Sequence, residues 1–168
     1  MPVPSIRPAV PADAAAIAAI YNEGIADRQA TFETDERGAE DVLGWLGDGA
    51  PPLLVADDDG AVVGWARAGA YSDRCAYAGI GEYAVYVARA ARGNGVGREL
   101  LEALARDAEA RGYHKLLSRI FPENEASLAL ARACGFREVG VHHKHGRLDG
   151  EWRDTVVVER LLGEAADG

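Results

Sequence analysis

Residues 80–112 read IGEYAVYVARAARGNGVGRELLEALARDAEARG, and this stretch decides the fold class. Residues 80–88 are rich in Val and Tyr and predict a long strand. Residues 89–94 predict a glycine-rich turn, and residues 95–111 predict a helix that Gly112 ends. The apolar face of this helix holds Val96, Leu100, Leu101, Leu104 and Ala108.

The glycine-rich turn has the composition of an anion-binding site. Gly93, Gly95 and Gly97 remove side chains, so backbone N–H groups there are free to face a ligand. The helix that follows adds unpaired N–H groups and the positive end of its dipole. With Arg92 and Arg98 beside it, the turn favours a phosphate or pyrophosphate. The alternative is a plain tight connection in which the glycines serve only the turn.

Two familiar phosphate motifs do not fit. A P-loop needs Gly-Lys-Ser/Thr, which is absent. A dinucleotide-binding fingerprint needs G-x-G-x-x-G after a first parallel strand, whereas the glycines here are spaced by two and follow four expected strands.

The remaining elements complete one mixed α/β domain over residues 1–162, with a short polar tail at 163–168. The other strands are expected at 5–10, 53–56, 61–70, 115–121, 139–147 and 151–161. The other helices are expected from Asp13, as N-cap, to about residue 28, at 40–46 with Val42, Leu43 and Leu46 inward, and at 125–134. Turns are expected at 57–60 and 149–150, and a loop at 71–77.

Composition and charge bound the function. The chain has 168 residues, of which 48% are hydrophobic and 27% charged, the balance of a soluble globular protein. Its formal charge of −9 repels phosphate backbones and anionic membranes, so neither nucleic acid nor a membrane is an expected partner. A local basic pocket for a small anion remains compatible with that charge.

Cysteine usage and the N-terminus favour the cytoplasm. Cys75 and Cys134 form no C-x-x-C pair, which fits a reducing compartment and gives no zinc motif. The N-terminus lacks a basic segment followed by an apolar stretch, and residues 14–20 are too short to span a bilayer.

The motif Arg92-x-x-Gly95-x-Gly97, between a strand and a helix, resembles the pyrophosphate-binding motif of the GNAT acetyltransferases. Further similar segments are residues 6–9 (IRPA), Asp13, 20–22 (IYN), 124–127 (NEAS), 134–136 (CGF) and 149–154 (DGEWRD). The resemblance implies a GNAT fold, a central mixed, mostly antiparallel sheet with helices on both faces. It also implies acetyl-CoA as acetyl donor.

The closing hairpin is similar to the phosphinothricin acetyltransferase-like branch. This branch includes enzymes that acetylate phosphinothricin, arsinothricin and methionine sulfone or sulfoximine. The resemblance therefore implies direct transfer, in a ternary complex, to the α-amine of a small amino acid or analogue, and a homodimer.

The resemblance also implies cofactor contacts. These fall on Val85, Tyr86, Val87, Arg92, Gly93, Asn94, Gly95, Val96, Gly97, Arg98, Asn124 and Ser127. Asn124 matches a family Asn at the pantetheine, and its alternative role is the N-cap of the helix at 125–134.

Glu82 is the candidate catalytic residue. It lies early on an otherwise apolar strand, where loss of water is expected to raise a carboxylate pKa. Only a neutral amine attacks a thioester, so a general base is useful, and the matching Glu of the branch is the proposed base. The alternative is a solvated Glu on a strand edge.

Two family acids are absent. Many GNAT enzymes carry a Tyr general acid where this chain has Ala131, and the phosphinothricin enzymes have a His where it has Asp149. A coenzyme A thiolate is a fair leaving group unaided, since a thiol has a pKa of about 8.5. Backbone N–H groups on the strand ending at Val87 are available to polarise the thioester carbonyl.

Four residues are expected at the acceptor. Arg74 and Tyr77 lie in the loop that approaches the acceptor site in this branch, and an Arg there suits an α-carboxylate. Phe32 and Glu33 match the acceptor wall. The alternatives are a surface Arg74 and a Phe32 that caps the core.

The histidines and tryptophans give weaker signals. His143 and His145 are expected on one face of a strand, but no third ligand has suitable spacing, so no metal is expected and a solvated strand rim is favoured over a metal site. Trp45, Trp65 and Trp152 are interpreted as core or dimer-contact aromatics.

Three functions follow from these residues. The first is acetyl transfer to a small amino-acid amine with Glu82 as base. The second keeps the enzyme class but acetylates a protein N-terminus or lysine. The third is an acyl-CoA-binding module without turnover, which the absence of Tyr at Ala131 supports.

Overall fold

The computed structural model describes residues 3–167 and contains one seven-stranded sheet of order β1-β2-β3-β4-β5-β7-β6. The strands are β1 (Ser5–Pro8), β2 (Leu53–Asp58), β3 (Ala61–Ala70), β4 (Ile80–Val87), β5 (Lys115–Ile120), β6 (Arg137–Leu148) and β7 (Glu151–Leu161). Every neighbouring pair is antiparallel except β4–β5, which is parallel. The predicted mixed, mostly antiparallel sheet is confirmed.

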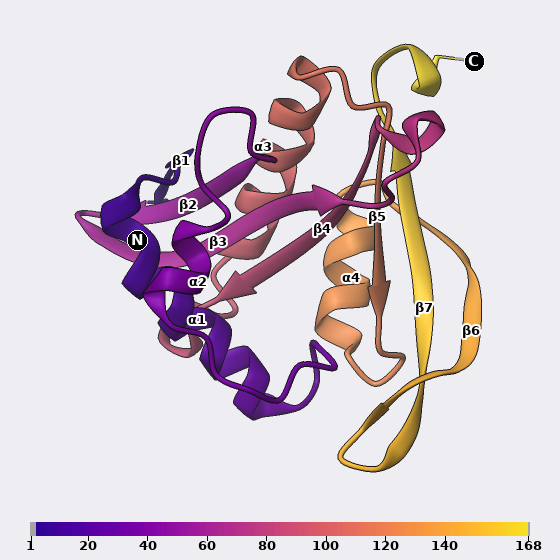
Figure 1. The fold of residues 1–168 in the computed structure, drawn as a ribbon, viewed down its shortest axis with the longest axis horizontal. Coiled ribbons are helices and arrows are strands. Elements are labelled where there is room, and N and C mark those ends of the chain that lie inside the picture. Colours follow the sequence, from indigo (N-terminus) through magenta and orange to yellow (C-terminus); the bar gives the residue numbers. More distant parts are fainter. Residues whose placement is uncertain (1–2, 168) are drawn as a thin grey trace.

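Helices cover both faces of the sheet. They are α1 (Ala14–Asp27), α2 (Ala39–Leu43), α3 (Val96–Ala110) and α4 (Glu125–Ala133). Figure 1 shows α1 and α2 in front of the β1–β4 half of the sheet and α3 behind it. The chain therefore has two cores, one on each side of a single sheet.

Strand alternation divides residues between these two cores. Leu53 and Val55 of β2 pack with Ile17 of α1, whereas Leu54 and Ala56 belong to the cluster around Leu100 of α3. This is the result of the two-residue period of a strand whose faces are both covered. The predicted apolar face of α3 is confirmed, because all five of its residues are buried.

Asp13 occupies the predicted N-cap position of α1, but its side chain makes no capping hydrogen bond. Its carboxylate instead accepts hydrogen bonds from both terminal nitrogens of Arg7, at 2.8 and 2.9 Å, and from the backbone N–H of Val10 at 2.8 Å. Asp13 is only 6% exposed. The stronger charge-assisted partner wins over the helix end, so Asp13 ties β1 to the start of α1.

The ends of α2 and β2 also differ from the predicted ones. The second helix is short and ends at Leu43 before Gly44, and Leu43 is 45% exposed, so its predicted inward position is wrong. Gly44 and the following glycines favour turns over helix continuation. The strand β2 continues to Asp58, which leaves Asp59 and Gly60 as the turn.

The expected pairing of His143 and His145 on one face is also wrong. Lys144 has a φ of 49°, and the register between β6 and β7 shifts between His142 and Gly146. This irregularity breaks the alternation of side chains. His145 consequently stacks on His142 with ring centroids 4.4 Å apart, while Nδ1 of His143 lies 3.2 Å from Asp154.

The feature that positions the site is the separation of β4 from β5. They pair only at Ile80, Gly81 and Glu82 of β4, and Figure 1 shows them side by side at one end and apart at the other. A Cβ on Gly81 would lie 3.0 Å from Leu116 Cδ2, so glycine permits the close end. At the open end, the Ser118 hydroxyl donates to the Tyr83 carbonyl at 3.0 Å and satisfies a group that lost its strand partner.

None of the helices in residues 3–167 is long and apolar enough to cross a membrane.

The Asp13 contacts predict a measurable contribution to stability. Replacing Asp13 by Ala leaves the Arg7 guanidinium and the Val10 N–H without this partner, at an expected cost of about 2 kcal/mol at pH 7. Urea unfolding measures it, with Asp48→Ala, an exposed loop aspartate, as control. An Asp13→Ala variant as stable as the control at pH 7 would contradict this role.

The same pair predicts a pH dependence. Hydrogen bonding to Arg7 lowers the pKa of Asp13 below its ordinary value. A lowered folded-state pKa stabilises the protein above the unfolded pKa of about 3.9, and this stability is lost as pH falls through the folded value. The difference in unfolding free energy between wild type and Asp13→Ala should therefore shrink below about pH 4. A difference that is constant from pH 7 to pH 2 would contradict it.

Candidate active site

A cleft of about 760 Å³ opens where β4 and β5 separate. Its walls come from the end of α1, from β4, the glycine-rich turn, the start of α3, and α4. Of the twelve predicted cofactor residues, all except Asn94 line this cleft. The Asn94 amide instead donates to the carbonyls of Ala91 and Arg92, at 3.3 and 3.4 Å, and so folds back on the turn.

Backbone groups of β4 face the open side of this cleft. The Ala88 N–H donates to the Val63 carbonyl at 2.9 Å, which fixes the alternation of hydrogen bonds between β3 and β4. The N–H groups of Val85 and Val87 therefore point away from β3, toward the gap left by β5. Beyond the last β4–β5 pair, these donors are available to a ligand.

The start of α3 is an uncapped helix N-terminus. Its first backbone hydrogen bond runs from the Glu99 N–H to the Gly95 carbonyl at 3.1 Å, so the N–H groups of Val96, Gly97 and Arg98 have no partner in the helix. Gly93 and Gly95 have φ values of 82° and 83°, and a Cβ on either would meet nothing within 4 Å. Glycine is thus required by the backbone conformation, and the space beside it is open.

The arginines of the turn have different partners. Arg92 Nη1 lies 2.9 Å from Asp27, and its Nε donates to the Val87 carbonyl at 3.1 Å. Arg89 Nη2 contacts the same Asp27 at 2.7 Å, so both arginines fasten the turn to the end of α1. The pKa of Asp27 is lowered by its hydrogen bonds to Arg89 and Arg92. Arg98 is exposed at the cleft and has no hydrogen bond or ion pair within residues 3–167.

Asn124 joins the cleft to a neighbouring cavity. Its side-chain oxygen accepts from the Ser127 N–H at 3.1 Å, which confirms the predicted N-cap of α4. Its amide nitrogen donates to the Gln29 carbonyl at 3.0 Å and so bridges α4 to the segment after α1. The neighbouring cavity measures about 450 Å³ and shares Val85, Tyr86 and Asn124 with the cleft.

Glu82 lies in this second cavity, in surroundings that differ from those expected. Its side chain is 31% exposed, and both carboxylate oxygens lie 2.7 Å from Nη2 of Arg119 on β5. The water-poor, apolar environment that the sequence predicted is therefore wrong. The strand pattern shows the neighbours along β4, whereas the charged partner comes from the adjacent strand.

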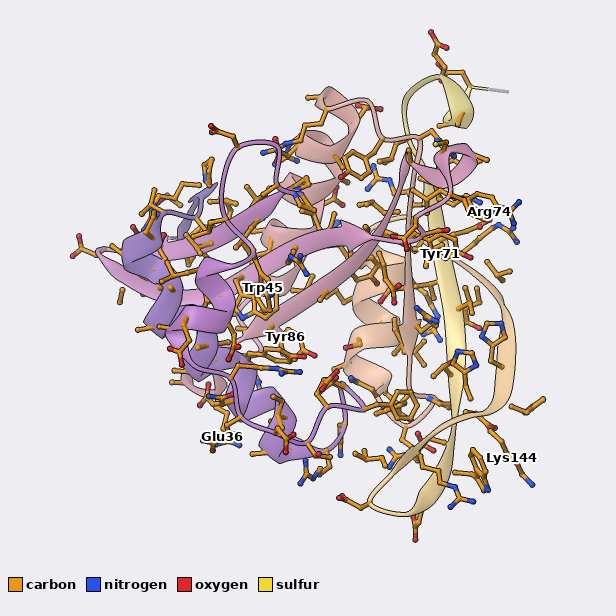
Figure 2. All side chains as sticks on the ribbon, in the orientation of Figure 1. Glu36, Trp45, Tyr71, Arg74, Tyr86 and Lys144 are labelled. Atoms are coloured by element: carbon orange, nitrogen blue, oxygen red, sulfur yellow. The ribbon has the colours of Figure 1, made fainter. Side chains whose placement is uncertain are left out.

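The predicted acceptor residues do not come together. Phe32 lines the cavity and packs edge-on against Phe121, with ring centroids 4.9 Å apart. Glu33 is exposed and pairs with Arg37 at 2.7 Å. Arg74 packs on the Tyr77 ring, with Cζ 5.7 Å from the ring centroid, and neither residue lines the cleft or the neighbouring cavity. Figure 2 shows Arg74 at the edge of the molecule, remote from Trp45 and Tyr86.

Sequence reasoning missed an aromatic and arginine wall. Trp65 stacks on Tyr86 with centroids 5.0 Å apart, and Trp45 lies 5.5 Å from Trp65. Arg67 lies beside them on β3, and Arg119 faces them from β5. A charged residue within the small, apolar strand AVVGWARAGA at 61–70 was the available signal for Arg67.

Three polar atoms of the cavity lining have no partner. Trp65 Nε1, Arg67 Nε and Thr155 Oγ1 are buried without a hydrogen bond within residues 3–167. Native proteins pair almost all such groups, so three around one cavity indicate a ligand-binding site.

The two positions at which related enzymes carry a general acid lie outside the cavity lining in this protein. Ala131 is on the buried face of α4 and belongs to the core, so it does not line the cavity. Asp149 is in the β6–β7 turn and pairs with Arg28 at 3.2 Å. Within the part of the chain that the structure describes, no group of three His, Cys, Asp or Glu side chains is placed to hold a metal ion.

Comparison with known proteins identifies the family. The family model described as "Acetyltransferase (GNAT) family" matches residues 17–136. The chain belongs to the GNAT acetyltransferases. It is accordingly an enzyme that transfers acetyl from acetyl-CoA to an amine.

Similar proteins narrow the GNAT branch. The chain is 34% identical to an L-methionine sulfoximine/L-methionine sulfone acetyltransferase of Pseudomonas aeruginosa, over 94% of each chain. A GNAT phosphinothricin acetyltransferase of Sinorhizobium meliloti, solved with acetyl-CoA, has a TM-score of 0.90 and 34% identity, covering 100% of this chain and 92% of that one. A ribosomal-protein-alanine N-acetyltransferase of Brucella melitensis has a TM-score of 0.89 and 37% identity, covering 94% and 99%.

The glycine turn predicts a binding defect that is separable from a folding defect. Gly95→Ala and Gly150→Ala each place Ala at a φ of 83° with open space around the Cβ, one at the cleft and one in the β6–β7 turn. Each should cost about 1–2 kcal/mol of stability. Only Gly95→Ala adds a methyl group in front of the α3 N–H groups, so only it should raise the acetyl-CoA dissociation constant, by about tenfold.

Thermal unfolding and calorimetry with acetyl-CoA measure the two effects. Equal acetyl-CoA affinities for Gly95→Ala and Gly150→Ala would contradict the assignment of the turn as the pyrophosphate cradle.

Proposed function

We propose that this GNAT enzyme acetylates the α-amine of a small amino acid or amino-acid analogue, of the phosphinothricin, arsinothricin or methionine sulfone/sulfoximine type. The observation that carries the proposal is the second cavity. It is contiguous with the donor cleft, it contains Glu82, and its lining has unpaired polar atoms. Its volume of about 450 Å³ suits a small molecule.

The donor side of the site fits acetyl-CoA. The pyrophosphate meets the N–H groups of Val96, Gly97 and Arg98 and the positive end of α3. The pantetheine arm lies between β4 and α4, beside Asn124 and Ser127. Acetyl-CoA supplies an activated acyl group, and the N–H groups of Val85 and Val87 are placed to polarise its carbonyl.

The acceptor side requires a deprotonated amine. Deprotonating an α-amine with a pKa of about 8 costs about 1.4 kcal/mol of free energy at pH 7. The Glu82 carboxylate takes the ammonium proton, directly or through water, and the amine nitrogen then attacks the thioester carbonyl. The Arg119 guanidinium, at 2.7 Å, holds the carboxylate in place in the cavity. The nitrogen loses its second proton to water as coenzyme A leaves as the thiolate, without a Tyr at position 131.

We extend the proposal to the assembly and location of the enzyme. The outer strand β6 is an exposed edge, on which Val139 and Val141 are 48% and 46% exposed, and Trp152 on the neighbouring strand β7 is 52% exposed. A long exposed edge strand that carries apolar side chains suits pairing with a second copy, which supports a homodimer. The free Cys75 and Cys134 thiols support a cytoplasmic location.

A second acceptor has one observation in its favour. The similar Brucella structure is that of a ribosomal-protein-alanine N-acetyltransferase, so a protein N-terminus is the competing acceptor. A peptide needs an open groove, whereas the packed rings of Phe32 and Phe121 form part of the wall of this cavity. Acetylation of a peptide panel in preference to amino acids would favour this alternative.

The base assignment predicts an activity defect with a pH signature. Coenzyme A release should be detected with phosphinothricin or methionine sulfone as acceptor. Glu82→Gln should lower kcat at pH 7 by about 100-fold. The deficit should narrow toward pH 9, because an acceptor amine with a pKa of about 8 then deprotonates itself.

The control is Glu36→Gln, an exposed glutamate labelled in Figure 2, which should retain full activity. Acetyl-CoA affinity of Glu82→Gln should equal that of wild type. Full activity of Glu82→Gln would eliminate the base role, and tight acetyl-CoA binding without turnover on any amine would instead indicate a non-catalytic binding module.

A further inference from the structure

The second cavity, which we call the acceptor cavity, is lined by two arginines, Arg67 and Arg119. Of these two, only Arg67 has no counterion within residues 3–167. Its side chain makes no hydrogen bond or ion pair there, and its buried Nε has no acceptor. Burial lowers the pKa of the guanidinium below its ordinary value, although the group stays charged at neutral pH. A desolvated, unpaired guanidinium is costly, so its persistence calls for an anionic ligand.

The geometry aims this charge at the reaction centre. Arg67 lies over the Trp45 ring, with Cζ 4.8 Å from the ring centroid. Its Nη1 lies 3.3 Å from the position that a Cβ on Gly69 would occupy, so the glycine leaves room for the guanidinium. Gly69 is paired directly with Glu82 on the neighbouring strand. The guanidinium therefore lies beside the residue that is directly opposite Glu82 in the β3–β4 pair.

The second arginine of the cavity, Arg119, is already paired with a carboxylate. Arg119 is bound by both oxygens of Glu82, so the two charges cancel. Arg67 then leaves the cavity with a net positive charge in a chain of formal charge −9. A positive pocket in an acidic protein selects a small anion.

We propose that Arg67 binds the α-carboxylate of the acceptor amino acid and determines its specificity. An α-amine and its carboxylate are separated by one carbon atom. An amine held beside Glu82 therefore brings its carboxylate toward the adjacent strand, where Arg67 lies. The fork of the guanidinium matches the carboxylate bidentately, and the Trp45 ring holds its plane. This role replaces the one that the sequence predicted for Arg74.

The inference rests on the proposed function, and the experiment separates the two. Acetyl-CoA turnover is measured with three acceptors: methionine sulfone, the same molecule without its carboxylate (3-(methylsulfonyl)propan-1-amine), and phosphinothricin. The variants are Arg67→Met, Arg67→Lys and, as a matched loss of charge, Arg106→Met, an exposed arginine on α3.

Arg67→Met should lower kcat/KM for both amino acids by about 100-fold, mainly through KM. Turnover of the decarboxylated amine and the KM for acetyl-CoA should change by less than about threefold. Arg67→Lys should show an intermediate loss, because it keeps the charge without the fork. Arg106→Met should behave as wild type.

Three results would overturn the inference. Equal losses on the amino acid and the decarboxylated amine would mean that Arg67 is structural. A loss confined to phosphinothricin would place its side-chain oxyanion, rather than the α-carboxylate, at Arg67. No loss on any acceptor would exclude Arg67 from binding. If Arg67→Met fails to fold, Arg67→Lys decides. The loss of kcat/KM of Arg67→Lys on methionine sulfone is then compared with its loss on the decarboxylated amine. If wild type acetylates no amino acid at all, the proposed function itself fails.

Discussion

The parallel pairing of β4 with β5 is the interaction on which the site depends, because it stops after three residue pairs. At the joined end, Gly81 allows the strands to approach against Leu116. At the open end, the Ser118 hydroxyl satisfies the Tyr83 carbonyl, and Arg92 satisfies that of Val87. Backbone carbonyls at a break in a sheet are costly unless they are paired. The two strands β4 and β5 therefore separate like a fork without leaving these carbonyls unpaired. The N–H groups of β4 between the two carbonyls remain available to a ligand.

In the proposed function, the separation of β4 from β5 also explains why donor and acceptor would meet at this place. The donor cleft runs along the open side of β4 to the start of α3, and the acceptor cavity lies on the α1 side of the same strand. Successive β4 side chains point to opposite faces, so Glu82 and Tyr86 face the cavity while Tyr83 belongs to the α3 core. Backbone N–H groups of one strand can thus serve the thioester while its side chains serve the amine.

Electrostatics within the site oppose the charge of the whole protein. The chain is acidic, yet Arg67, Arg98 and the uncapped end of α3 face the two cavities. The positive charges at the two cavities thus attract the anionic groups of a nucleotide-like donor and of an amino acid, although the protein as a whole is acidic. The same acidic surface disfavours larger polyanions, which accords with an enzyme of small molecules.

Much of this architecture is predictable from local sequence signals, and the rest depends on contacts between strands. The glycine turn, the apolar face of α3 and the N-cap at Asn124 follow from short-range rules, because their determinants lie within one turn or one helix. The partner of Glu82 does not, since Arg119 is 37 residues away and meets it only across the β4–β5 pair. Arg67 was overlooked because a strand pattern alone does not say which face covers a cavity. Asp13 was assigned to the helix it precedes, whereas Arg7 of β1 binds it more strongly.

The most direct test of the fork as the donor site is an amide NMR titration of the protein with coenzyme A. The account predicts the largest shifts at the backbone amides of Val85, Val87, Gly95 and Gly97, with Gly112, which follows the opposite end of α3, unchanged. Shifts centred on another surface, with those four amides unperturbed at saturation, would contradict it.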